Sequence, residues 1–443
     1  MTAAAGDQLL VSMCTNEFII PAHPHIGRMA RTSLRVLLLV LILINVSYVR
    51  GFSLPGGLTT TYLIILWLFA GLTIIVIMVG DTGTIVVTSR WWLWIGLVAW
   101  IFVSFLYNIF LRPDPAVAIQ FVVELGLNVL LFVSVVFLLD RDAMVSVYRG
   151  FVGLSAVSAA LLAAFPLFVG FEQVRRVGGY RFPGAVNNIS QMIAVAILFA
   201  IAGLVCEDDW REKRLELAAL PALSAALFLT GSRAAILALL AALVLLSVVH
   251  DYKMIRIWFV VAGAFVVGFI VLTRVYNLVG LYRFNIDSLK VAVDNRLFNY
   301  TEAIHDAGFS LANILFGGGM YRYSPLAKTD VATIIYPHNY VISFYVHVGL
   351  PAAILFTIIL LKNGRSLLYW TLFDDEMLDY VILSTLLALI VVVMYSFTSG
   401  RLTRTFPLWI VLGASEYLYA AKQLHQDESA SLDKTLIESV SSD

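Results

Sequence analysis

Long apolar runs alternate with short polar segments along most of the chain. A run of about 18 or more apolar residues is typical of a membrane-spanning helix, because hydrocarbon offers the backbone N–H and C=O groups no partner except each other. The pattern predicts about twelve such helices, at 36–54, 62–80, 91–111, 117–139, 150–170, 187–205, 215–231, 233–249, 256–273, 340–361, 379–397 and 405–421. The sequence therefore predicts an all-α, polytopic membrane protein.

The polar segments set the boundaries of the predicted organisation. We expect an N-terminal segment at 1–35, transmembrane helices 1–9 at 36–273, a large outer loop at 274–339, helices 10–12 at 340–421 and a C-terminal tail at 422–443. Within the loop, Leu297, Tyr300 and Ile304 recur at helical spacing. This spacing predicts a short amphipathic helix that lies on the outer surface.

Composition and charge agree with a membrane protein and add a difference between its two sides. Hydrophobic residues make up 60% of the chain and charged residues 13%, against roughly 45–50% and 25% in soluble domains. Lysine and arginine are more frequent in the short loops on the side of the N-terminus, which predicts that both termini lie in the cytoplasm. Because the acidic residues gather there too, the outer face is left cationic and rich in arginine. Arginine suits phosphate and carboxylate ligands, so these residues either bind an anionic ligand or anchor the lipid headgroups.

Arg233 lies in a tight turn between two predicted helices, 215–231 and 233–249. The two helices are barely long enough to span a membrane, so Arg233 is expected partly within it, near the outer surface. A cation at that depth is a functional candidate because burying its charge is costly. The alternative is an arginine that reaches up to the headgroups.

The outer loop holds further candidates. Arg296 is placed in the first turn of the expected amphipathic helix, and the glycines at 317–319 allow either close approach to a ligand or a plain turn. His338 lies between Pro337 and Asn339, at the membrane boundary before the tenth helix. A histidine there can take a proton from a sugar hydroxyl, or it is only a polar residue at a helix end.

The loop between the fifth and sixth helices combines Arg175, Arg176 and Arg181 with the amides Asn187 and Asn188. This mixture suits a phosphate-bearing ligand, although an exposed loop can show it too. No cluster of histidine and cysteine has the spacing of metal ligands, so we expect no metal and no cofactor. Nothing indicates a nucleotide site or a nucleic-acid surface.

Four motifs occur in a characteristic order between residues 170 and 360. They are Arg181-x-x-Gly-x-x-Asn187-Asn188, Thr-Gly-Ser-Arg233-Ala-Ala, Asn-Arg296-x-x-x-Tyr-x-x-Ala-Ile followed by Phe-Gly-Gly-Gly, and His338-Asn followed by Gly349-Leu-Pro. Together they resemble the bacterial O-antigen ligase and polysaccharide polymerase superfamily. Tyr300 departs from the family, which often has tryptophan there, but it preserves an aromatic anchor.

The resemblance implies a metal-independent membrane glycosyltransferase of the GT-C type in the bacterial inner membrane, with its active site facing the periplasm. The implied donor is a glycan on undecaprenyl pyrophosphate, and the catalytic candidates are His338, Arg233 and Arg296. Further substrate-binding candidates are Arg181, Asn188, Arg322 and Asn339.

Three functions remain open at this stage. A ligase would transfer the glycan to the lipid A core in lipopolysaccharide biosynthesis, whereas a polymerase would extend a lipid-linked repeat unit of O-antigen or exopolysaccharide. A transporter or flippase of an anionic lipid-linked glycan is the alternative from another class. Transporters often show repeated halves, and no repeat is visible in this sequence.

Overall fold

The described part of the protein consists of helices. The computed structural model describes residues 88–111, 125–126, 128–136, 139, 141–169, 185–207, 209, 211, 213–230, 232–249, 286–318, 339–373, 379–397 and 406–440. Within these ranges there are helices and no strands, which confirms the all-α prediction. The expected spans at 36–54, 62–80 and 256–273 lie outside them.

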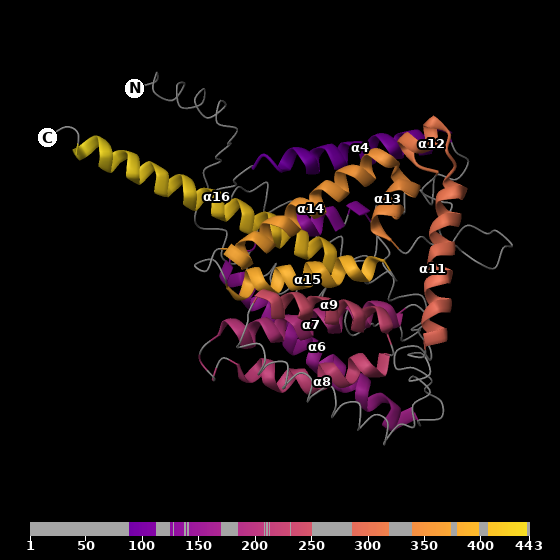
Figure 1. The fold of residues 1–443 in the computed structure, drawn as a ribbon, viewed down its shortest axis with the longest axis horizontal. Coiled ribbons are helices and arrows are strands. Elements are labelled where there is room, and N and C mark those ends of the chain that lie inside the picture. Colours follow the sequence, from indigo (N-terminus) through magenta and orange to yellow (C-terminus); the bar gives the residue numbers. More distant parts are fainter. Residues whose placement is uncertain are drawn as a thin grey trace.

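Four described helices are long and apolar enough to cross a membrane. They are α4 (Trp91–Leu111), α6 (Arg141–Val169), α7 (Ala185–Cys206) and α14 (Leu350–Phe373). Shorter helices run beside them, namely α8 (Arg214–Thr230), α9 (Arg233–Val249), α15 (Tyr380–Ser396) and the first part of α16 (Phe406–Val440) (Figure 1). The chain is therefore a helical bundle of the kind that the apolar runs predict.

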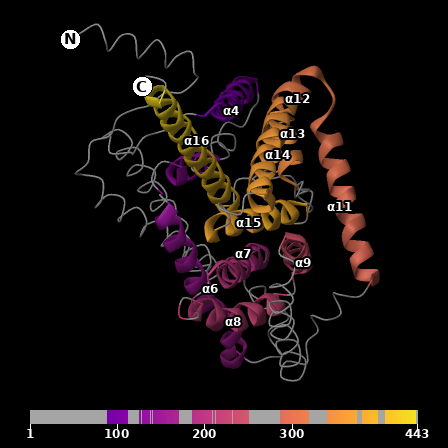
Figure 2. The same cartoon turned by 60° about the vertical axis from the view of Figure 1, so that its left-hand side comes forward.

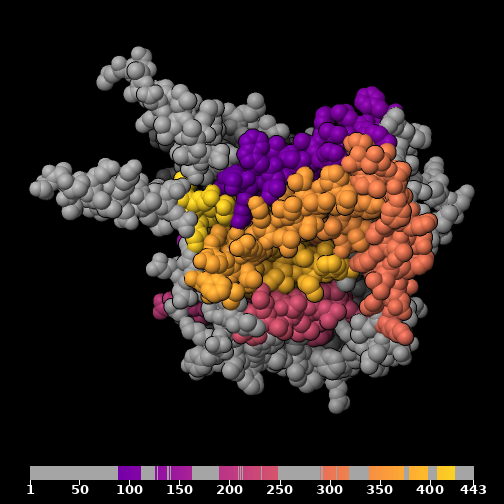
Figure 3. All heavy atoms as spheres, turned by 45° about the horizontal axis from the view of Figure 1, so that its top comes forward, coloured from indigo at the N-terminus to yellow at the C-terminus, as the bar shows by residue number. Residues whose placement is uncertain are grey.

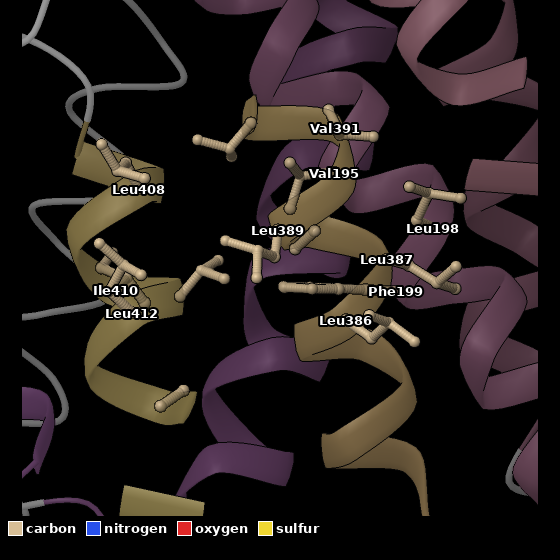
Figure 4. Packing of buried hydrophobic residues seen from close by; sticks show 14 of the residues in the cluster. Val195, Leu198, Phe199, Leu386, Leu387, Leu389, Val391, Leu408, Ile410 and Leu412 are labelled. Atoms are coloured by element: carbon tan, nitrogen blue, oxygen red, sulfur yellow. The ribbon is translucent and has the colours of Figure 1, made fainter. Parts of the chain in front are cut away.

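The centre of the bundle is α7. Its most apolar 18-residue window is 89% buried inside the protein, whereas that of α4 is 28% buried, so protein surrounds α7 and α4 faces outward. Val195 and Phe199 of α7 pack beside Leu386 and Leu389 of α15 (Figure 4). A helix that is apolar on all sides has no polar face to expose, and α7 takes the central position for that reason.

Polar contacts show which helix ends lie together. Arg141 at the start of α6 pairs with Asp379 before α15, and Arg149 of α6 pairs with Glu207 after α7 at 2.6 Å. The same Arg149 lies 3.5 Å from Glu216 in the first turn of α8. We call this the Arg149 end of the bundle.

The other end carries α11 (Ile286–Ala307), and we call it the α11 end. This helix runs across the ends of α13, α15 and α9 rather than along them (Figures 1 and 3). The expected amphipathic helix is therefore present, and it is longer than the segment around Leu297 and Ile304 that predicted it. At the Arg149 end, the last part of α16 projects away from the bundle (Figure 2), so the expected C-terminal tail is helical as far as Val440.

The expected tenth span at 340–361 is two helices instead of one. It divides into α13 (Tyr340–Val348) and α14, with Gly349 between them at a φ of 108°. The Gly349 N–H closes α13 by donating to the carbonyls of Phe344 and Tyr345, at 2.9 and 3.0 Å. A residue with a β-carbon rarely adopts this φ, so the glycine fixes the point at which the helix breaks.

Candidate functional site

Polar side chains gather at the α11 end, where several helices start or stop. Ser190 at the start of α7, Thr230 at the end of α8, Ser232 before α9, and Tyr395 at the end of α15 are all buried there. Ser190 Oγ and Tyr395 Oη are 3.5 Å apart, at the limit of a hydrogen bond. Buried polar groups need partners, so the helix ends that meet here are suited to polar contacts with one another.

Arg296 of α11 is half-buried over this polar end. Burial lowers the pKa of its guanidinium, and the nearby hydroxyl groups of Tyr300 and Tyr395 raise it again. Within the part of the chain that the structure describes, no carboxylate pairs with Arg296. An arginine stays charged in a protein, so a positive charge is held here without an anion from the described residues.

Arg233 is the first residue of α9 and is also half-buried. The turn before it is fixed locally: Ser232 N donates to Thr230 Oγ1 at 3.3 Å, and Ile236 N donates to the Ser232 carbonyl at 3.2 Å. Because α8 begins at the Arg149 end, this turn lies at the α11 end. The helix start adds a partial positive charge to that of the side chain, so the turn is suited to an anion.

Asn339 begins α13, and its side chain has a structural role. It is buried, and its Oδ1 accepts a hydrogen bond from Ile342 N at 3.1 Å, as the N-cap of the helix. The cap stabilises the first turn of α13. It also fixes the chain direction immediately after position 338, where the sequence analysis places the candidate base His338.

The glycine run and the Gly349 break contact each other. Gly317 ends α12 (Leu311–Phe316) at a φ of 81°, and a β-carbon there would lie 2.6 Å from the carbonyl carbon of His347. Gly318 N donates to the Val346 carbonyl at 2.8 Å. A β-carbon on Gly349 would overlap the carbonyl oxygen of Leu315. The glycines of the two motifs therefore serve close backbone packing between α12 and α13.

The transmembrane helix α4 holds the other side of α12. Trp100 Nε1 donates to the Leu315 carbonyl at 3.1 Å, and Ser104 Oγ and Asn108 Nδ2 donate to the Phe316 carbonyl at 2.8 and 3.2 Å. These three side chains repeat every four residues, so they share one face of α4. They explain why an otherwise apolar helix carries serine and asparagine, a feature that the sequence alone left without a role.

Other sequence-predicted residues fall outside this description. His338, Arg181 and Arg322 lie outside the described residues, and Asn188 belongs to α7 by its backbone only. Of the candidate site residues predicted from sequence, the structure therefore describes the side chains of Arg233, Arg296 and Asn339. Sequence reasoning missed Tyr395 and Ser190, and their only signal was a polar residue at each end of an apolar run. No group of three or more histidine, cysteine, aspartate or glutamate residues gathers in the described ranges.

Comparison with known families agrees with the sequence motifs. Residues 218–357 match the family described as O-antigen ligase, a stretch that runs from α8 into α14 and includes Arg233, Arg296 and Asn339. A comparison with curated proteins finds no match. The family match and the ordered motifs confirm the expected resemblance, and the apolar helices fit it. Residues 218–357 are therefore similar to the O-antigen ligase family, and the apolar helices indicate a multi-pass membrane protein.

Proposed function

We propose that this protein transfers a glycan from undecaprenyl pyrophosphate to an acceptor hydroxyl at the α11 end of the bundle. The observation that carries the proposal concerns Arg296. This residue is half-buried over the polar side chains of the α11 end and has no carboxylate partner among the described residues. The proposed donor carries its glycan on a pyrophosphate, and a guanidinium is a suitable partner for that pyrophosphate. The family match supports the reaction class, since the matched family is that of O-antigen ligases.

The arginines at the two ends of the bundle differ in a way that supports this assignment. At the Arg149 end, Arg141 and Arg149 are each paired with a carboxylate. Such pairs stabilise the bundle but leave no charge for a ligand. Arg296 at the α11 end is not neutralised in this way, and the starts of α7 and α9 point their N–H groups toward the same end.

The proposed reaction is a displacement at the anomeric carbon of the donor. The acceptor oxygen forms the new glycosidic bond, the bond from that carbon to the pyrophosphate oxygen breaks, and undecaprenyl pyrophosphate leaves with the electron pair. Arg233 and Arg296 stabilise the negative charge that develops on the leaving group. His338 takes the proton of the acceptor hydroxyl, and such base catalysis contributes about 10²- to 10⁴-fold.

Reconstitution tests the proposal directly. The protein is placed in proteoliposomes with an undecaprenyl-pyrophosphate-linked glycan and candidate acceptors, and product formation is measured. Arg296→Ala, Arg233→Ala and His338→Ala should each lower the transfer rate by at least about 10²-fold. Lys290→Ala is the matched control, because Lys290 is an exposed basic residue on the same helix as Arg296, and it should transfer normally.

The same system separates the alternatives. Transfer to a lipid A core acceptor identifies a ligase, whereas extension of a second lipid-linked glycan identifies a polymerase. We favour the ligase. If the Arg296→Ala variant and the His338→Ala variant both transfer normally, the mechanism is contradicted. Movement of the donor across the membrane without transfer would identify a flippase.

A further inference from the structure

The way in which α11 is attached to the bundle has a consequence for Arg296. Ala303 and Ala307 of α11 pack against Val346 of α13, which fixes the last turns of the helix. The residues around Arg296 lie earlier in the helix, where Leu297 and Phe298 are exposed. Small apolar contacts at one end of a helix do not by themselves fix how the other end is rotated.

Tyr300 supplies a directional contact near Arg296. Its hydroxyl donates a hydrogen bond to the backbone carbonyl of Phe397, the residue that ends α15. Burial raises the pKa of this hydroxyl, so it stays protonated and remains a donor at neutral pH. Arg296 and Tyr300 are four residues apart and therefore neighbours on one face of α11.

A second tyrosine, Tyr395 of α15, lies near enough to influence the same guanidinium. It is fully buried at the end of α15, two residues before Phe397, and it faces Ser190 of α7. Both tyrosines act on the charge of Arg296. A neutral phenol does not cancel the charge of the guanidinium as a carboxylate would, so Arg296 keeps its positive charge beside the two tyrosines.

We propose that Tyr300 is a positioning residue for Arg296, and that its bond to the Phe397 carbonyl fixes α11 to the end of α15 so that the guanidinium is held over the α11 end of the bundle. This inference rests on the proposed function, in which Arg296 contacts the pyrophosphate. A displacement of about 1 Å in such a group can cost about 10² in rate. The hydroxyl of Tyr300 then contributes to transfer without touching the substrate.

The test removes that hydroxyl and leaves the ring. Tyr300→Phe should lower kcat/KM for the lipid-linked donor about 10- to 100-fold, with kcat/KM measured in proteoliposomes. Thr301→Val is the matched control, because the Thr301 hydroxyl is exposed and bonds to Leu297 of its own helix at 2.9 Å. The control should transfer normally.

A double-mutant cycle separates positioning from a general loss of stability. If Tyr300 acts through Arg296, Tyr300→Phe should cost little further activity in an Arg296→Lys background, because the group to be positioned has already changed. If the fold loss in kcat/KM of the double variant equals the product of the two single losses, the inference is overturned. Normal donor kinetics in Tyr300→Phe would overturn it too. An active Arg296→Ala variant would instead contradict the proposed function, so the two failures are distinct.

Tyr300→Trp keeps the test decisive if the phenylalanine variant does not fold. Its indole N–H is a hydrogen-bond donor on an aromatic ring, so it can replace the hydroxyl as the donor to the Phe397 carbonyl. Recovery of at least about a tenth of the normal kcat/KM in Tyr300→Trp supports the inference. A folded Tyr300→Trp protein with transfer as low as that of Arg296→Ala overturns it.

Discussion

Gly349 shows how a single residue can position a site from a distance. It combines a left-handed φ of 108° with a backbone contact to Leu315, and it ends α13 through its own N–H. The start of α13 carries the Asn339 cap and follows position 338 directly. The glycine therefore links the packing of α12 to the place where the proposed base enters the site.

We predict that Gly349→Ala destabilises the protein and lowers transfer. The strained φ alone costs about 1–3 kcal/mol, and the added methyl group also overlaps the Leu315 carbonyl. Gly364→Ala is the control: Gly364 lies inside α14, a β-carbon there would be 3.9 Å from its nearest neighbour, and alanine favours a helix by about 1 kcal/mol. Thermal unfolding in detergent should show a lower melting temperature for Gly349→Ala and an equal or higher one for Gly364→Ala.

Residues differ in how far the sequence reveals their roles. Arg233 and Arg296 could be proposed from sequence because a cation in or near a membrane is costly and needs a reason. Asn339 was expected to bind substrate, and the structure adds a capping bond that a sequence pattern shows only when the helix start is known. The contact of Gly349 with Leu315 joins residues far apart along the chain, so no local pattern could indicate it.

At the scale of elements, α12 connects the predicted outer loop to the membrane helices. It has only six residues, and such a short helix is not stable alone. The carbonyls of its last turn are bonded by Trp100, Ser104 and Asn108 of α4, and the ring of Phe316 stacks on those of Trp100 and Tyr107. The loop is therefore anchored to α4 by side chains rather than by its own helical structure.

We predict that Ser104→Ala combined with Asn108→Leu loosens α12 without unfolding the bundle. Each lost hydrogen bond costs about 1 kcal/mol, so amide hydrogen exchange in 311–318 should quicken about tenfold or more. Thr357→Ala is the control, because Thr357 bonds only to Ala353 within its own helix α14, at 2.7 Å. Unchanged exchange in 311–318 of the double variant would contradict the proposed anchoring of α12 to α4.

Element boundaries follow from sequence where hydrophobicity alone decides them. The apolar run at 233–249 matches α9, since the turn before it breaks the pattern sharply. In contrast, α6 begins at Arg141, nine residues before the expected start at 150, because Arg141 and Arg149 find carboxylate partners on neighbouring elements. Tertiary ion pairs extend this helix past its apolar run, and the hydrophobicity of the sequence does not indicate such pairs.

At the scale of the whole molecule, the two ends of the bundle hold charge in different ways. Near the start of α4, Glu416 of α16 accepts hydrogen bonds from Trp94 at 3.0 Å and from Asn363 at 2.9 Å, and Arg90 lies 3.4 Å over the ring of Tyr419. Together with the Arg149 pairs, these contacts give the charged groups at this end partners from other helices. At the α11 end, Arg296 has no carboxylate partner among the described residues, and this difference between the two ends fits the proposed ligand site at the α11 end.

The predicted orientation gives each end a side of the membrane. If both termini lie in the cytoplasm, α11 is periplasmic and the Arg149 end is cytoplasmic, which places Arg296 on the side where we propose that transfer takes place. Exposed residues mark both ends: Asn295 lies on α11, and Arg211 lies between α7 and α8. Cysteine introduced at either position can report its side.

We predict that, in a protein with Cys14 and Cys206 replaced by serine, a membrane-impermeant maleimide labels Asn295→Cys in intact spheroplasts. Arg211→Cys should be labelled only after the membrane is permeabilised, since the reagent cannot cross it. Each variant is its own control, because permeabilised cells show the total reactive thiol. The reverse pattern would place α11 and Arg296 in the cytoplasm, and a periplasmic transfer reaction at this site would then be impossible. Labelling of both positions in intact spheroplasts would contradict the assignment of the two ends to opposite sides of the membrane.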